Sequence, residues 1–175
     1  MRKIKNLKGF TLIELVVVAG VFVSVSSIIL SIFIISLRGS RKSELILTMK
    51  QNGNFAMSQM IKQIRYAQSI DAPASCVPSV TQSSITITSL DGGQTTFSCQ
   101  TSPTSSIASN SASLVDTNQV RVNACSFVCS QPTASEPPTV TISFTLLPKN
   151  ASVLSENTGS VPFTTSVTMR NFTSN

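Results

Sequence analysis

The feature that most constrains this chain is a long apolar segment without a single charged side chain. The run extends from Leu15 to Leu37. A helix of that length crosses the hydrocarbon core of a bilayer, which needs about 20 apolar residues. Glu14 stands immediately before the run. Because a carboxylate costs about 2.5 to 3.5 kcal/mol at the centre of a membrane helix, a carboxylate at the start of such a segment indicates a functional role.

A short basic leader precedes the apolar run. Basic side chains beside an apolar segment are retained on the cytoplasmic side of a membrane, so we expect the leader to face inward and the rest of the chain outward. Basic residues also follow the run, at Arg38, Arg41 and Lys42, so the charge rule alone does not fix this orientation. The basic residues of the leader are Arg2, Lys3, Lys5 and Lys8.

The segment Gly9-Phe10-Thr11-Leu12-Ile13-Glu14-Leu15 joins the leader to the apolar run. With Lys8 before it, this segment resembles, residue for residue, the N-terminus of type IV prepilins and of the pseudopilins of type II secretion. A general similarity continues to about residue 68. The resemblance implies a pilin-like fold, most similar to a minor pilin or minor pseudopilin. Ser31 stands where many type IV pilins have a proline, which puts any helix-melting step tied to that proline in doubt.

The same resemblance assigns roles to three residues. A membrane prepilin peptidase would cut between Gly9 and Phe10 and would N-methylate Phe10, while Glu14 would set the registry between subunits. The other partners that the resemblance implies are further pilin or pseudopilin subunits and an inner-membrane assembly platform. Cleavage would remove the four basic residues of the leader and lower the formal net charge from +6 to about +2.

Glu14 has a possible counter-ion in the processed chain. The new ammonium group on Phe10 would lie one helical turn away, and Glu14 would pair with it or with the ammonium of a neighbouring subunit. Such a partner is required because an unpaired ion in a low dielectric is heavily penalised. The alternative is that Glu14 only stabilises the first helical turn through the helix dipole. That alternative leaves the glycine and the leader unexplained.

Two other interpretations of the N-terminus compete with the prepilin one. An ordinary secretory signal peptide would use Phe10 to Val23 as its apolar core, but the apolar run is too long and no small-x-small site ending in alanine follows it. An uncut single-span anchor is harder to exclude. Sequencing of the mature N-terminus distinguishes all three.

The second half of the expected helix is amphipathic. Between Glu44 and Gln68, apolar residues recur at spacings of three and four, so the sequence predicts one long helix from Phe10 to Gln68. We expect it to be loosened near Gly39-Ser40 and near Asn52-Gly53. The apolar stripe is expected to fill the core of a head domain, not to bind a metal. Its members are Ile46, Met49, Met57, Met60, Ile61, Ile64 and Ala67.

Small residues follow one face of the membrane half of the helix. Such a row lets neighbouring helices approach closely. The alternative, weighed equally, is that the serines bond back to carbonyl groups of their own helix. The residues are Gly20, Ser24, Ser27 and Ser31.

The remainder of the chain is rich in serine and threonine and reads as strands and turns. The sequence predicts an α+β fold, with the long helix packed on an antiparallel sheet. Asp91-Gly92-Gly93 suits a tight turn, Pro132 to Pro138 a loop, and Thr101 to Ser113 a flexible surface loop. The predicted strands are Ser84–Leu90, Gln94–Cys99, Gln119–Val128, Thr139–Leu147 and Val161–Asn171. The predicted parts are a leader at 1–9, a membrane or filament-core helix at 10–37, an amphipathic helix at 38–70 and a β head at 71–175.

Four cysteines, Cys76, Cys99, Cys125 and Cys129, lie on the outward side of the expected span. An even count outside the cytoplasm favours disulfides, and three pairings are possible. Cys76 with Cys99 would close the first hairpin and leave Cys125 with Cys129. That second pair needs a turn or bulge, since residues four apart in a regular strand are about 13 Å apart. Pairing of Cys99 with Cys125 or Cys129 stays open.

The composition disfavours enzymes and nucleic-acid binding proteins. The chain has no histidine, and its acidic residues are scattered singly, so we expect no catalytic residues, no metal site and no cofactor. Beyond residue 70 the chain has three basic and five acidic residues, so it has no excess of positive charge that would bind nucleic-acid phosphates. The basic residues there are Arg121, Lys149 and Arg170.

These expectations combine into one functional hypothesis. The chain would be a structural subunit of a type IV pilus or a type II secretion pseudopilus. It would begin as a single-pass protein of the inner membrane with its N-terminus in the cytoplasm, and the head would end on the cell surface. The main alternative is a cell-surface binding module on a single-span anchor that never polymerises. A tip subunit with an adhesive head would share the anchor.

Overall fold

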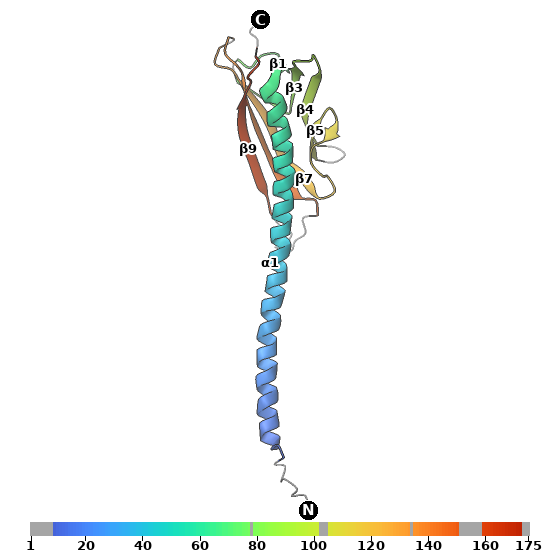
Figure 1. Ribbon diagram of the computed structural model, residues 1–175, viewed down its shortest axis with the longest axis vertical. Helices are drawn as coiled ribbons and strands as arrows, with labels where there is room; N and C mark the ends of the chain where they lie inside the picture. The colour runs from blue at the N-terminus through green and yellow to red at the C-terminus, as the bar shows by residue number, and fades with distance from the viewer. Residues whose placement is uncertain (1–8, 78, 102–104, 134, 151–158, 173–175) are drawn as a thin grey trace, which may run out of the picture. The chain divides into compact units, whose positions relative to one another are not determined.

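The computed structural model describes residues 9–77, 79–101, 105–133, 135–150 and 159–172. The chain divides into two compact units, Met1–Ser40 and Arg41–Asn175. Helix α1 (Leu12–Tyr66) contributes to both units, and every described strand belongs to the second unit, which we call the head (Figure 1). The head has helix and antiparallel sheets in one core, so the predicted α+β class is confirmed.

The part of α1 within the head packs by the stripe that the sequence predicts. Ile46 and Ile61 are half-buried against the core, and the other stripe residues are buried. The helix ends at Tyr66, two residues before the predicted end, because strand β1 begins at the next residue. It is continuous through Gly39 and Gly53, so the predicted loosening is wrong. The buried stripe residues are Met49, Met57, Met60, Ile64 and Ala67.

The described end of the chain covers the last turn of α1. The backbone N–H of Arg170 donates to the carbonyl of Arg65 at 2.9 Å, and Asn171 Nδ2 donates to the carbonyl of Tyr66 at 3.2 Å. These bonds satisfy carbonyl groups that a helix end leaves without intrahelical partners. The last predicted strand was therefore too long: it ends at Thr168, and the residues after it cap the helix.

The strands form two antiparallel sheets instead of the single sheet that the sequence predicts. One sheet has the order β1-β3-β4-β5-β6 and the other has the order β2-β7-β8-β9. The first sheet contains β1 (Ala67–Ala72), β3 (Ser84–Ser89), β4 (Gln94–Gln100), β5 (Ser106–Ser109) and β6 (Ala112–Ser113). The second contains β2 (Val80–Gln82), β7 (Val120–Ser130), β8 (Thr139–Pro148) and β9 (Val161–Thr168).

Alternating side chains of both sheets build the core together with α1. Strand β8 alternates strictly between half-buried and buried residues, as expected of a strand with one face on the core. In Figure 1, α1 lies with β9 on one side and β3, β4 and β5 on the other. The largest fully buried side chains come from all three layers and include Phe97, Phe127, Met60, Ile87 and Ile142.

The five predicted strands correspond to β3, β4, β7, β8 and β9, but the predicted loop Thr101 to Ser113 is wrong. That segment contains β5 and β6, and Ile107 and Ala108 are completely buried. Residues 106–109 pair with Phe97 to Gln100 of β4. The small polar composition of the wider segment Thr101 to Ser113 suggests a loop, and the pairing with β4 outweighs that local preference.

The tight turn at Asp91-Gly92-Gly93 is confirmed. Gly92 has a φ of +79°, which glycine adopts without the strain that a Cβ atom would introduce. The Asp91 side chain accepts a hydrogen bond from the Gly93 N–H at 3.1 Å, which holds the turn locally. The turn joins β3 to β4 as a hairpin.

Two disulfides connect the cysteines, and neither belongs to the pairing that closes the first hairpin. Cys76 bonds to Cys129, and Cys99 bonds to Cys125, with Cα–Cα distances of 5.2 and 5.8 Å. Short strand β2 explains the difference: it pairs with β7 with Val80 opposite Cys129, which brings the segment before it to the second sheet. Cys99 of β4 is then free to join Cys125, so this bond links the two sheets.

Gly53 lies where α1 meets the ring of Phe163. A Cβ atom on Gly53 would lie well under 3.0 Å from three atoms of that ring. The ring has little room to move, because it stacks on Phe144 with centroids 5.0 Å apart. Glycine is therefore required here for close approach, although it is a poor helix former.

We expect Gly53→Ala to destabilise the head. In an open helix this change would add about 1 kcal/mol of stability, but here the added methyl group must displace Phe163 from its stack. Overpacking of this kind costs about 1 to 3 kcal/mol. Urea unfolding of the full chain in detergent, followed by circular dichroism, measures the change.

Gly39→Ala is the matched control, because a Cβ atom there meets nothing within 4 Å. It should leave the free energy of unfolding unchanged or raise it. Adding Phe163→Leu to Gly53→Ala should restore part of the lost stability. A stabilisation by Gly53→Ala as large as that by Gly39→Ala would contradict the contact.

Candidate processing and assembly segment

The predicted processing site lies directly before α1. Gly9 and Phe10 are exposed and not helical, and Phe10 keeps 81% of its surface accessible. A bond in accessible backbone outside a helix can enter a protease cleft, whereas a bond inside a helix cannot. The leader residues Arg2, Lys3, Lys5 and Lys8 lie outside the described residues.

Thr11 and Glu14 form the start of the helix. The Glu14 N–H donates to Thr11 Oγ1 at 3.3 Å, and the Leu15 N–H donates to the Thr11 carbonyl at 3.3 Å. Thr11 is thus the N-cap, and threonine followed three residues later by glutamate is the capping-box pattern. Sequence reasoning missed this cap, although the Thr-x-x-Glu spacing is a signal for it.

The position of Glu14 agrees with the local role expected for an acid in the first turn of a helix. Its side chain is exposed and lies near the N-terminal end of the helix dipole. Such an acid contributes about 0.3 to 1 kcal/mol. A registry role is a separate property that concerns other subunits, and it stays a prediction.

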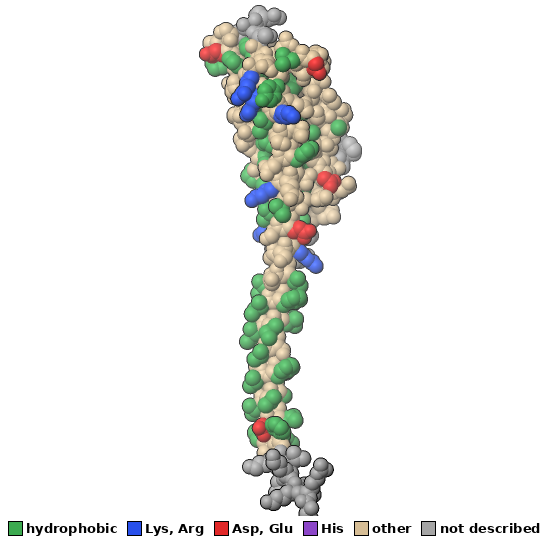
Figure 2. All heavy atoms as spheres, viewed as in Figure 1, with side chains coloured by type: hydrophobic (Ala, Val, Ile, Leu, Met, Phe, Trp, Pro, Cys, Tyr) green, Lys and Arg blue, Asp and Glu red, His purple; other side chains and the backbone are tan. Residues whose placement is uncertain are grey.

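The helix from Leu12 to Leu37 exposes an apolar surface on every side. The most hydrophobic 18-residue window of α1 has a mean hydropathy of 2.6, and none of that window is buried. Figure 2 shows hydrophobic side chains along the visible face of this part of the helix. By length and composition the segment could span a membrane. Phe22 and Ile35, for example, keep 71% and 70% of their surfaces accessible.

The serines of the small-residue row bond to their own helix. Ser24 Oγ donates to the carbonyl of Val21, Ser27 Oγ to that of Ser24, and Ser31 Oγ to that of Ser27, each at 2.8 Å. This is the second of the two interpretations considered above. The bonds satisfy the hydroxyl groups internally, so the row presents small, neutral side chains on the helix surface.

The described part of the head has disulfides that stabilise its structure, but no cluster of side chains that would form a metal site. Among the described residues, no group of three or more Asp, Glu, Cys or His side chains is placed to hold a metal ion. All four cysteines form disulfides, which occur mainly in proteins outside the cytoplasm. The disulfides therefore suggest an extracytoplasmic head.

The architecture is pilin-like, with a long, apolar N-terminal helix packed on antiparallel sheets. Comparison with known proteins finds no matching family, no matching curated protein and no matching solved structure.

Proposed function

We propose that the protein is a structural subunit, of the minor pilin or minor pseudopilin type, of a type IV pilus or a type II secretion pseudopilus. The observation that carries this proposal is the coincidence of the Gly9–Leu15 motif with an uncovered apolar helix. An apolar surface of this size is not stable in water and needs lipid or other helices around it. Lipid would cover it before assembly, and neighbouring helices would cover it afterwards.

Processing would create the charge that assembly uses. Cleavage after Gly9 leaves Phe10 as the first residue, with an ammonium group next to the cap residue Thr11. Glu14 lies in the first turn, so its carboxylate and the ammonium are within one turn of each other along the chain. When helices of neighbouring subunits stack with a stagger, the ammonium of one can neutralise Glu14 of the next. A wrong stagger would leave an ion unpaired in a low dielectric.

Helix packing in a filament core would use the small side chains of the apolar helix. Without a hydrophobic driving force between helices in lipid, close approach and van der Waals contact drive association. A Cβ atom added at Gly20 would meet nothing within 4 Å, and Gly20 lies on the same row as Ser24. The head would then be displayed on the filament surface or at its tip. The oxidised disulfides are consistent with that location.

The maturation route can be tested by mass spectrometry of the protein purified from cells with an active prepilin peptidase. We expect a chain that begins at Phe10 and carries one added methyl group. In cells without the peptidase, the same protein should keep Met1 to Gly9. Recovery of the intact leader from cells with the active enzyme would contradict the proposal.

A further inference from the structure

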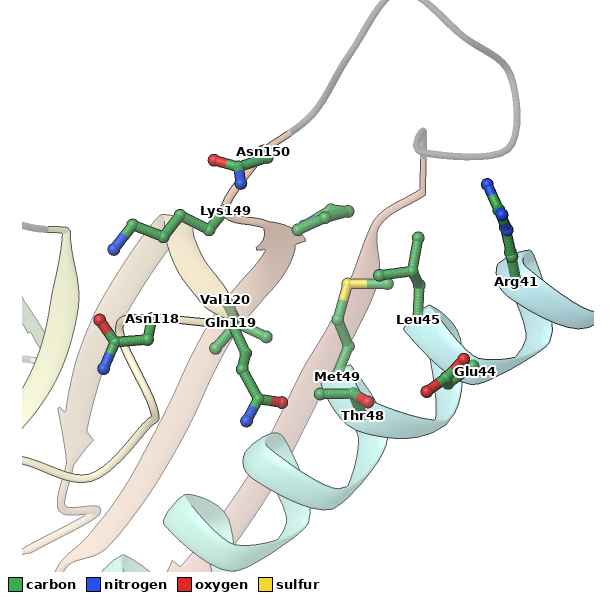
Figure 3. Close-up of a pocket in the computed structure, with 11 residues that line it drawn as sticks. Arg41, Glu44, Leu45, Thr48, Met49, Asn118, Gln119, Val120, Lys149 and Asn150 are labelled. Carbon is green, nitrogen blue, oxygen red and sulfur yellow. The ribbon is translucent and has the colours of Figure 1, made fainter.

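A cavity of about 420 Å³ lies beside the first two turns of α1 within the head. One wall is the helix segment from Arg41 to Met49, and the other walls come from the start of β7 and the end of β8 (Figure 3). Met49 and Val120 are buried at its base. The remaining lining is a mixture of apolar side chains, neutral amides and charged groups.

Two cations from distant parts of the sequence line this cavity. Arg41 comes from α1 and Lys149 follows β8, and Figure 3 shows them on opposite sides of the opening, with the Lys149 ammonium directed away from Arg41. Both are exposed, and among the described residues neither forms an ion pair. Among the described residues, Glu44 is the one acidic residue of the lining. The described side chains that line the cavity thus carry a net charge of +1, which matches a ligand with one negative charge.

The sequence position of Arg41 places it at the level of lipid headgroups. It follows Leu37, the last residue of the apolar run, by four residues, which is about 6 Å along a helix. The headgroup region is about 5 to 7 Å deep on each side of the hydrocarbon core. This step rests on the membrane placement in the proposed function.

We propose that this cavity binds the headgroup of an anionic phospholipid of the phosphatidylglycerol class from the outer leaflet around the helix. Arg41 and Lys149 bind the phosphodiester, since charge-assisted hydrogen bonds from cations to phosphate are strong. The amides of Asn118 and Gln119 bind the glycerol hydroxyl groups. A zwitterionic headgroup binds less well, because it brings no net negative charge to a lining whose described side chains carry a net charge of +1.

The proposal also accounts for basic residues on the side of the span where the charge rule does not expect them. Arg41 would bind lipid phosphate there, and it would not determine the orientation of the chain in the membrane. Each basic residue near an anionic surface contributes about 1 kcal/mol to membrane attraction. The bound lipid would hold the head against the membrane until the subunit leaves the bilayer.

The test uses the full chain reconstituted in nanodiscs of phosphatidylethanolamine and phosphatidylglycerol. Native mass spectrometry counts the phosphatidylglycerol retained by the released protein. We expect one retained lipid for the wild type and about thirtyfold lower retention for Arg41→Gln/Lys149→Gln. The control Lys62→Gln/Arg170→Gln loses the same charge elsewhere on the head and should behave as the wild type. Equal loss in both variants would overturn the proposal.

Glu44→Gln provides a test in the opposite direction. It removes the acid that competes with the phosphate, so retention of phosphatidylglycerol should rise about threefold or more. A gain that is confined to phosphatidylglycerol does not result from misfolding, because apolar surface exposed by misfolding would retain both lipids. Unchanged or lower retention would contradict the assigned geometry.

Two further experiments identify the source of the phosphate and test this inference separately from the proposed function. Glycerol 3-phosphate added to phosphatidylethanolamine nanodiscs should not bind detectably; binding as strong as that of the lipid would show a site for free phosphate instead. Failure of the chain to insert into nanodiscs would overturn both proposals. Insertion without a preference for phosphatidylglycerol would overturn this inference alone.

Discussion

Replacing both Cys76 and Cys129 by alanine is expected to lower the free energy of unfolding of the head by about 3 to 4 kcal/mol. The physical reason is the entropy of the unfolded chain, which a bond across 53 residues restricts strongly. Both cysteines are buried, at 4% and 1% exposure, so alanine also leaves unfilled volume. Because domains are stable by only about 5 to 15 kcal/mol, this is a large fraction of the total.

The measurement is urea unfolding of the oxidised full chain in detergent. The matched variant Cys99→Ala/Cys125→Ala removes a bond across 26 residues, and it should also cost about 3 to 4 kcal/mol. Peptide mapping without reduction gives the pairing directly. Peptides that join Cys76 to Cys99, or Cys125 to Cys129, would show that the connectivity is wrong.

The helix was predictable because two simple patterns define it. The run from Leu15 to Leu37 is almost continuously apolar, the stripe from Ile46 to Ile64 has helical spacing, and no proline interrupts them. The error at Gly53 has a clear cause. Glycine weakens a helix on average, but the close contact with Phe163 belongs to tertiary structure and leaves no local signal in the sequence.

The disulfide pairing could not be predicted because it depends on β2, which is only three residues long and pairs with β7 far along the chain. Segments this short have no recognisable period. β5 could not be recognised for the same reason, since Ser106 to Ser109 has only four residues and its burial depends on its neighbour β4. The division into two sheets could not be predicted either, because it depends on β4 pairing with β5 and not with β7.

The candidate assembly segment could largely be predicted from the sequence, whereas the cavity could not. The motif from Gly9 to Leu15 is contiguous, so its chemistry can be inferred without the fold. Arg41 and Lys149 are 108 residues apart and have no pattern in common. Their position at one cavity follows from the way β7 and β8 pack beside α1.

Glu14→Gln is expected to abolish incorporation of the protein into filaments while leaving insertion and cleavage intact. Glutamine keeps the size of the side chain but cannot neutralise the ammonium group of a neighbouring Phe10. Removing one partner of a buried ion pair costs about 3 to 5 kcal/mol, which lowers an association constant by about a hundredfold or more. The measurement is the ratio of protein in sheared filaments to protein in the membrane, by immunoblotting.

Thr11→Val separates the registry role from the local role of Glu14 in the helix. It removes the hydroxyl group that accepts the Glu14 N–H, which costs about 1 kcal/mol at the helix start, but it keeps the carboxylate. If Glu14 only stabilises the first turn, both variants should reduce incorporation by similar, small amounts. If it sets the registry, Thr11→Val should assemble nearly as well as the wild type, and Glu14→Gln should not assemble. A single-span receptor that never polymerises would show no difference between Glu14→Gln and the wild type in its amount at the membrane, and no filament fraction for either.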